Sequence, residues 1–244
     1  MGGTTHGLTM NLVHNSARLF ARLVRRFGKS VCADDPKRPP RADGLVMEER
    51  KQLIRRILSS IPNNSILLSG RPATGKTSIL LYLKGCLADA EDPVMDFYPV
   101  YIDLHGVPED LLFATVADAV LGQLAFAPPS KVARFGPDYD HRDLARDFRS
   151  VIRVLKERSQ KPTRLVLLAD GIDELNHYNP RTTQRVRSLF MASLSESLVM
   201  VASAVEIDKN WEQEGSPWYN FFEEIELTPV DNESDGRDRI PRDG

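Results

Sequence analysis

The chain has 244 residues, and its 32 Lys or Arg and 34 Asp or Glu give a formal net charge of −2 at pH 7. This balance excludes a molecule that is basic over its whole surface, and no apolar run approaches the length of a membrane span. Apolar and charged contents of 41% and 27% are ordinary for a globular protein with one large α/β domain and an appendage. The two cysteines, Cys32 and Cys86, form neither a metal-binding spacing nor a disulfide framework. Without a secretory pattern at the start, they favour a reducing, cytoplasmic location.

The first 43 residues are expected to form a separate segment. Residues 1–60 carry twelve Lys or Arg against five Asp or Glu, and residues 8–30 contain no acid. Residues 8–30 have apolar positions at helical spacing and predict a basic amphipathic helix, which a proline-rich linker follows up to residue 43. Packing on the rest of the chain or on a partner protein is the ordinary interpretation. The alternatives are an acidic membrane surface, nucleic acid, or an organelle transit peptide.

Residues 65–78 contain the first sharp motif. A short apolar run, SILLS, predicts a buried strand, and the leucines that follow residue 78 have helical spacing. Between them stands GRPATGKT, which matches the P-loop pattern in its required order of strand, loop and helix. Backbone N–H groups of such a loop surround phosphate oxygens, Lys76 reaches the β- and γ-phosphates, and the Thr77 hydroxyl binds Mg²⁺. The predicted nucleotide-binding residues are Gly70, Arg71, Pro72, Ala73, Thr74, Gly75, Lys76, Thr77 and Ser78.

Residues 164–175, RLVLLADGIDEL, contain the second sharp motif. An apolar run ends at Asp170, and Asp173 and Glu174 follow within four positions. The Mg²⁺ of a bound nucleotide needs a carboxylate at the end of a neighbouring buried strand, which predicts that role for Asp170. Asp173 or Glu174 would orient or deprotonate the attacking water. A single acid here would be an ordinary polar strand end, but three acids downstream of a P-loop favour a catalytic site.

The string of four apolar residues, Asp, Gly, an apolar residue, Asp and Glu resembles the Walker B motif of STAND-type NTPases, including the NACHT group, within the AAA-like branch of P-loop ATPases. The resemblance covers about residues 44–230. It implies a three-layer α/β sandwich around a parallel sheet of about five strands in the order 5-1-4-3-2. It also implies an ATPase that needs ATP and Mg²⁺, in which Thr77 and Asp170 hold the metal and Lys76, Asp173 and Glu174 serve hydrolysis.

The rest of the chain is consistent with alternating strands and helices, which predict a parallel sheet with right-handed crossovers. Helices are expected at 47–61, 109–124, 142–160 and 182–194, further strands at 98–106, 197–205 and 221–230, and a loop at 124–141. Residues 231–244 lack apolar periodicity and predict a disordered acidic tail. The aromatic residues between 211 and 222 are expected to pack in the core, with base stacking as the alternative.

Two features of the predicted ATPase depart from the family pattern. After the strand at 197–205, where relatives carry a polar sensor of the γ-phosphate, the polar candidates are Ser203 and Glu206. No arginine occurs between Met191 and Gly236, so we expect a slow ATPase. The favoured function is an Mg-ATP-dependent switch that acts on an unknown protein partner. A nucleotide-binding scaffold with little hydrolysis and a DNA-associated loader-like ATPase are the alternatives, and oligomerisation stays open.

Overall fold

The computed structural model describes residues 44–124, 136, 138–191, 196–208, 211, 213–214, 216 and 218–228, with side chains from Arg50 onward. The basic helix predicted at 8–30, the linker that follows it and the predicted tail at 231–244 lie outside these residues, so they stay predictions. The elements in chain order are α2 (Gly44–Ser60), β1 (Ser65–Ser69), α3 (Lys76–Ala88), β2 (Asp96–Asp103), η1 (Glu109–Leu111), α4 (Leu112–Gln123), α5 (His141–Arg158), β3 (Thr163–Asp170), η2 (Ile172–His177), α6 (Pro180–Met191), β4 (Leu198–Ala204) and β5 (Phe222–Glu226).

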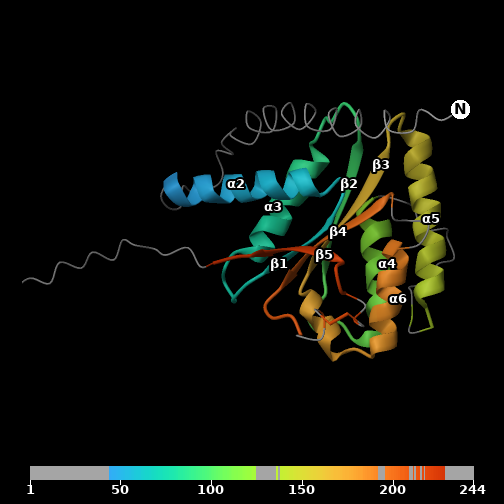
Figure 1. The fold of residues 1–244 in the computed structure, drawn as a ribbon. Coiled ribbons are helices and arrows are strands. Elements are labelled where there is room, and N and C mark those ends of the chain that lie inside the picture. Colours follow the sequence, from blue (N-terminus) through green and yellow to red (C-terminus); the bar gives the residue numbers. More distant parts are fainter. Residues whose placement is uncertain are drawn as a thin grey trace, which may run out of the picture.

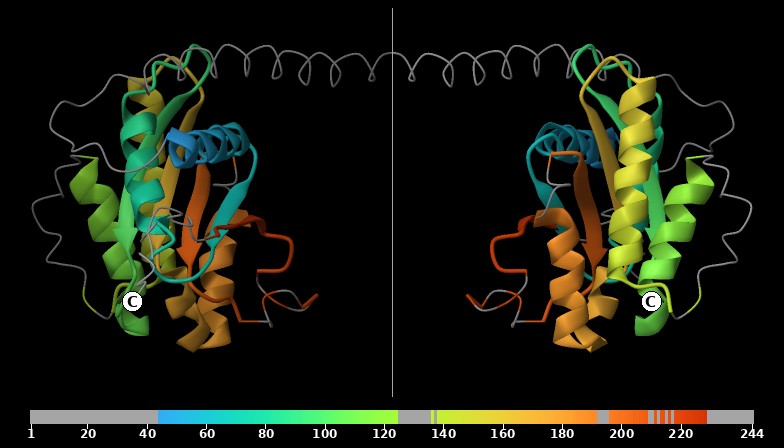
Figure 2. Two further views of the ribbon diagram at one scale, coloured as in Figure 1. Left: turned by 90° about the vertical axis from the view of Figure 1, so that its left-hand side faces the viewer. Right: turned by 90° about the vertical axis from the view of Figure 1, so that its right-hand side faces the viewer.

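The five strands form one parallel sheet in the order β2-β3-β4-β1-β5 (Figure 1). Read from the other edge, this is the order 5-1-4-3-2, so the expected fold class and topology are confirmed. Helices cover both faces of the sheet, with α2 and α3 on one side and α4, α5 and α6 on the other (Figures 1 and 2). The three-layer arrangement explains why β3 and β4 are nearly continuous apolar runs, since neither face of these central strands meets water.

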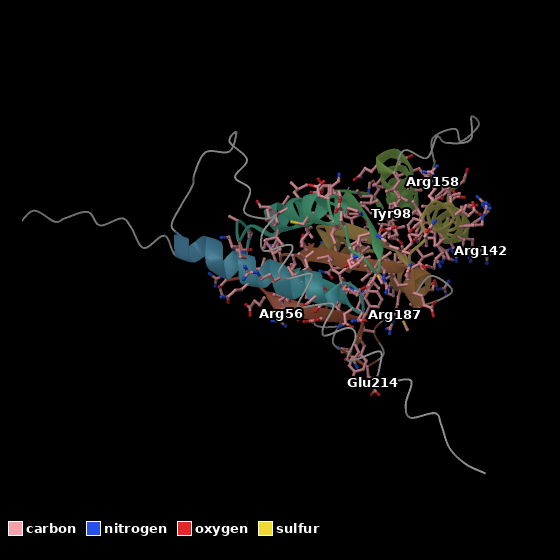
Figure 3. All side chains as sticks on the ribbon, turned by 90° about the horizontal axis from the view of Figure 1, so that it is seen from above. Arg56, Tyr98, Arg142, Arg158, Arg187 and Glu214 are labelled. Atoms are coloured by element: carbon pink, nitrogen blue, oxygen red, sulfur yellow. The ribbon has the colours of Figure 1, made fainter. Side chains whose placement is uncertain are left out.

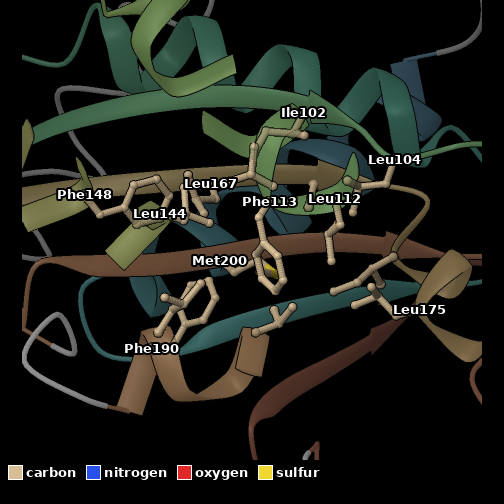
Figure 4. A pocket seen from close by; sticks show the side chains of 15 residues that line it. Ile102, Leu104, Leu112, Phe113, Leu144, Phe148, Leu167, Leu175, Phe190 and Met200 are labelled. Carbon is tan, nitrogen blue, oxygen red and sulfur yellow. The ribbon is translucent and has the colours of Figure 1, made fainter. Parts of the chain in front are cut away.

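Successive side chains of β3 point to opposite faces of the sheet, so they belong to two separate core layers. Leu165 and Leu167 belong to the layer under α4, α5 and α6, whereas Val166 and Leu168 belong to the layer under α2 and α3. The first layer contains an apolar cavity of about 40 Å³ that is lined mainly by aliphatic and phenylalanine side chains (Figure 4). The core on this side is therefore not packed to full density.

The boundaries of several elements differ from those expected. Strand β2 begins at Asp96 rather than at residue 98, because the pairing with β3 starts at Asp96 opposite Thr163. Pro99 is tolerated because β2 is an edge strand. The strand ends at Asp103 rather than at Gly106, whose φ of 67° belongs to the turn that follows. The helix expected from residue 109 begins as the short 3₁₀ turn η1, and the 3₁₀ turn η2 after β3 was not anticipated.

Four of the five aromatic residues between 211 and 222 form a packed cluster, which confirms the packing interpretation for Trp211, Trp218, Phe221 and Phe222, whereas Tyr219 is 38% exposed. Trp211 and Trp218 are 8% and 4% exposed, and their ring centroids lie 5.0 Å apart. Trp218 also stacks on Phe222 at 5.5 Å and meets Phe221 edge-on. Rings that bury their faces against one another are not available to stack on bases. Among the described residues, no helix is long and apolar enough to cross a membrane.

Candidate nucleotide-binding site

The two sequence motifs meet at the carboxyl edge of the sheet. The P-loop follows β1, and η2 follows β3, with β4 between these two strands. Because all strands run in the same direction, the loops that leave β1, β2, β3 and β4 gather at one edge. The structure therefore brings the P-loop lysine and the acids of the second motif to a common site.

The backbone of residues 70–75 curls through conformations that need glycine at two positions. Gly70 and Gly75 have φ of 145° and 86°. A Cβ on Gly70 would lie 2.5 Å from the carbonyl oxygen of Leu227, just after β5, so no larger residue fits there. Ala73 also has a positive φ, 64°, which strains a residue that has a Cβ. The Arg50 guanidinium donates from α2 to the Thr74 carbonyl oxygen at 2.6 Å and supports the strained loop.

Helix α3 begins with an open N-terminus. Its N-cap residue, Gly75, makes no side-chain cap hydrogen bond, so no side chain of the cap competes for the first backbone N–H groups. Thr77 and Ser78 in this first turn are exposed. The positive end of the helix and its first N–H groups follow the loop directly, which suits a bound anion.

Lys76 is buried at the centre of the site, with 8% of its surface exposed. Its ammonium Nζ donates to the carbonyl oxygens of Gly70 at 2.5 Å and Arg71 at 2.9 Å. Burial lowers the pKa of Lys76, and the negative charges of Asp173 and Asp170 oppose that change. The lysine is therefore held inside the loop by groups that a phosphate could replace.

Asp170 lies at the end of β3, 3% exposed, and two hydroxyls hold its carboxylate. Tyr101 on β2 donates to Oδ2 at 3.0 Å, and Ser203 on β4 donates to Oδ1. Burial, followed by the hydrogen bond to this carboxylate, raises the pKa of Tyr101 well above its usual range. Ser203 also accepts from the Gly171 N–H at 3.2 Å. The residue singled out as a possible sensor thus contacts the second motif itself.

The other two acids have different surroundings. Glu174 accepts the Gly106 N–H at 2.8 Å and ties η2 to the loop that follows β2. Asp173 accepts the Val205 N–H through Oδ2 at 3.3 Å, whereas its Oδ1 is buried and has no hydrogen-bond partner among the described residues. An unpaired buried carboxylate oxygen is costly in a folded protein, so this atom marks a position where a donor belongs.

The same residues fit a metal only together with a nucleotide. No group of three or more His, Cys, Asp or Glu side chains in the described part of the chain is arranged to hold a metal ion alone. The exposed Thr77 hydroxyl and the Asp170 carboxylate are the oxygen donors that suit Mg²⁺, which keeps several waters and takes further ligands from phosphates. The donor set is therefore compatible with Mg²⁺ brought in on a nucleotide.

Sequence reasoning missed the supporting residues of the site. Tyr101 and Arg50 act through contacts that only the folded chain creates, between β2 and β3 and between α2 and the P-loop. His105 is exposed, but its ring lies over Gly171, where a Cβ would come within 2.7 Å of Nε2. The Asp103 carboxylate is 2.7 Å from His105 Nδ1 and raises the pKa of the imidazole.

Comparisons with known proteins establish the fold. No protein-family model and no curated protein matches the sequence. Among solved structures, the chain is similar to the Aeropyrum pernix ORC2 protein in its ADPNP–ADP complexes, with a TM-score of 0.51 and 12% identity over 80% of this chain and 50% of the other. It is also similar to the Aeropyrum pernix ORC1 protein in complex with DNA, with a TM-score of 0.51 and 15% identity over 80% of this chain and 48% of the other.

The chain therefore shares the P-loop NTPase fold of these two structures, and it spans about half the length of each. At such low identity the likeness reports the fold alone. The STAND or NACHT subgroup implied by the second motif stays a prediction, as do the individual site residues.

Proposed function

We propose that the chain binds ATP together with Mg²⁺, hydrolyses it slowly and acts as a nucleotide-dependent switch on a partner protein. One observation carries the proposal. A buried lysine, bonded to backbone carbonyls of a P-loop, lies within the electrostatic influence of two acids that the sequence separates from it by about a hundred residues. Structural packing alone gives no reason for a buried cation beside a buried carboxylate oxygen that has no partner.

The P-loop residues 70–78 would bind the phosphates. Their backbone N–H groups and the open start of α3 supply donors, and Lys76 would exchange the carbonyl oxygens of Gly70 and Arg71 for phosphate oxygens. Thr77 and Asp170 would hold Mg²⁺, which would neutralise charge on the phosphates when bound. Tyr101 and Ser203 would keep the Asp170 carboxylate in a fixed orientation by donating to its two oxygens.

We assign the attacking water to Asp173 and a positioning role to Glu174. The Oδ1 atom of Asp173 is buried and accepts no hydrogen bond from the described residues, so it would be available to a water that enters with the nucleotide. Glu174 already accepts a backbone N–H from Gly106, so its carboxylate fixes the loop beside the site. Both carboxylates would then serve hydrolysis. Asp173 would orient the attacking water, and Glu174 would hold the loop after β2 in place beside the site.

A nucleotide-binding scaffold with little hydrolysis is the second candidate. It is favoured by Ser203, since the hydroxyl at the sensor position is engaged by Asp170 and Gly171 rather than directed to a γ-phosphate. A DNA-associated, loader-like ATPase is the third candidate. The DNA named in the ORC1 complex belongs to that protein and supports this candidate only by likeness of fold.

Calorimetric titration with Mg-ATP tests the proposal. Lys76→Ala should lose most of the ATP affinity, whereas Lys84→Ala, which removes the same charge from the same helix outside the site, should bind as the wild type does. Equal affinity of the wild type and Lys76→Ala would refute the phosphate-binding role. Turnover measured on the same samples separates the ATPase from the scaffold. A partner captured only in the ATP-bound state of Asp173→Asn would support the switch.

A further inference from the structure

The outer face of α5 carries a row of basic side chains that the proposed ATPase does not use. The row consists of Arg142, Arg146, Arg149, Arg153 and Lys156, and all five are exposed. At about 100° per residue, these positions fall within an arc of about 80° on one side of the helix. The opposite side carries the buried residues Leu144, Phe148, Val151 and Leu155. The row therefore points away from the core and follows the helix axis.

Helix α5 holds the row straight and rigid. A capping box between Asp140 and Asp143 closes its first turn, and basic residues occupy its last turn. From Arg142 to Lys156 the helix rises by about 21 Å, at 1.5 Å per residue. Over that length one strand of a DNA duplex carries about six phosphates, at 3.4 Å each. The five cations thus match the charge density of a phosphate backbone.

Helix α6 extends the basic surface at the start of α5. The two helices lie side by side on one face of the molecule (Figure 2). Burial lowers the pKa of His141, the Asp140 carboxylate opposes this change, and the charges of Arg185 and Arg142 lower the pKa further, so both cations act on this side chain. Arg181 and Arg185 are exposed one turn apart, and α6 contains no acid. The sequence that forms α5 and α6 has nine Lys or Arg and three acids, in a chain whose net charge is −2.

The acids on α5 do not neutralise the row. Arg146 pairs with Asp143 and Asp147, and Arg153 pairs with Glu157, but these two arginine side chains stay 64% and 69% exposed. Ion pairs this exposed are weak, so a phosphate can compete for the guanidinium groups. Arg142, Arg149 and Lys156 make no ion pair with any residue that the structure describes.

We propose that the basic row of α5, with Arg181 and Arg185 of α6, binds the phosphate backbone of double-stranded DNA without reading its sequence. Four of the five positions in the row are arginine, whose planar guanidinium matches phosphate oxygens better than lysine does. The described residues offer no exposed aromatic side chain on α5 for stacking, which a single strand would need. The proposed surface includes none of residues 8–30, and the proposal does not depend on ATP binding.

A membrane surface fits the row less well. Helices that lie on acidic membranes insert apolar side chains beside their cations. The exposed large apolar residues in the described part of the chain are Leu81, Val94, Met191, Val205 and Tyr219. None of them belongs to α5, and Met191 stands alone at the end of α6. The row on α5 therefore offers charge without an apolar anchor of its own.

The test uses the full chain and a fluorescein-labelled duplex of about 20 base pairs, with binding followed by anisotropy between 50 and 200 mM salt. The variant Arg142→Gln, Arg149→Gln, Lys156→Gln removes three cations from the row. A control of equal charge, Arg55→Gln, Arg56→Gln, Lys84→Gln, removes two arginines and one lysine from α2 and α3, and its folding is checked because Arg56 pairs with Glu223. Arg56 and Arg142 lie on opposite sides of the molecule (Figure 3). Residues 8–30 remain in both variants and contribute equally.

The row variant should weaken binding at 50 mM salt by about tenfold or more and reduce the slope of log K against log salt by up to about three. The control should keep the wild-type slope. Should the triple variant unfold, Arg149→Gln alone should reduce the slope by about one. An unchanged slope in the row variants, an equal loss in the control, or no duplex binding by the wild type would overturn the proposal. If the row variant lost binding to phosphatidylserine vesicles but bound the duplex as the wild type does, the proposal would be overturned in favour of a membrane. The row variant should keep the wild-type affinity for ATP. A negative result for DNA binding is therefore distinct from a negative result for the nucleotide site.

Discussion

Ser203→Ala should destabilise the protein strongly for a substitution that removes one oxygen atom. Ser203 is 1% exposed, and its hydroxyl donates to Asp170 Oδ1 while it accepts the Gly171 N–H at 3.2 Å. The alanine variant leaves a buried carboxylate oxygen and a buried N–H each without that partner. An unsatisfied buried group costs about 1–3 kcal/mol, more when it is charged, so the free energy of unfolding should fall by about 2–4 kcal/mol. For a domain of this size, that is a fall in Tm of roughly 4–16 °C.

The measurement is urea unfolding followed by circular dichroism, with Ser188→Ala as the control. Ser188 is exposed on α6 and donates only to the Arg185 carbonyl oxygen within its own helix, so its loss should change stability by less than about 0.5 kcal/mol. If Ser203→Ala is as stable as the wild type, the hydroxyl does not support Asp170, and the argument that Asp170 is held in a fixed orientation fails.

Three further predictions concern the site and the core. Lys76→Ala should weaken ATP binding by at least tenfold in calorimetry, because it deletes the buried cation of the P-loop; unchanged affinity would contradict the phosphate role. Asp173→Asn should bind ATP but turn it over about a hundredfold more slowly in a phosphate-release assay, with a smaller loss for Glu174→Gln, whose carboxylate acts through Gly106. If Glu174→Gln lost more turnover than Asp173→Asn, the roles assigned to the two acids would have to be exchanged. Val186→Ile adds a methylene beside the cavity of about 40 Å³ and should stabilise by up to about 1 kcal/mol in urea unfolding, whereas the exposed Val94→Ile should have no effect.

The sequence was sufficient for the strands and the helix that flank the two motifs, because these motifs have strict local requirements. A P-loop needs a strand before it and a helix after it, and SILLS and the leucines after residue 78 supply both. The apolar run that ends at Asp170 is too short for a typical buried helix, which favours a buried strand, and it lies within β3. The order of the strands came from resemblance to a family, since strand periodicity contains no information about neighbours.

The contacts that complete the site could not be predicted. Tyr101 and Ser203 reach Asp170 because β2 and β4 pair on either side of β3, and this requires the register as well as the order. Arg50 meets the Thr74 carbonyl because α2 crosses near the P-loop, although the two residues are 24 positions apart. The free Oδ1 of Asp173 is visible only as an unmet hydrogen bond in the folded chain. Sequence patterns identify the residue types of a site, whereas packing decides which atoms stay available.

The last prediction concerns an arginine that the site lacks. An arginine that reaches a neighbour's γ-phosphate is worth about a thousandfold or more in rate. The resemblance of the second motif implies a position for it after the fourth strand. The sequence has no arginine between Met191 and Gly236. Arg181 and Arg185 are exposed on α6, whereas Arg187 donates to the Ser216 carbonyl oxygen, so only the first two are placed to reach a second chain.

We therefore expect slow turnover whose rate per chain is constant across a wide range of protein concentration, because each site would work without its neighbour. The measurement is phosphate release at increasing protein concentration, with Arg181→Ala and Arg185→Ala beside the wild type and Arg187→Ala as the control. A rate per chain that rises steeply with concentration, and that Arg181→Ala or Arg185→Ala abolishes, would mean that neighbours complete the site. The proposed function would then change from a switch to an assembling motor. Arg181 and Arg185 would contact the nucleotide of a second copy of the chain rather than DNA.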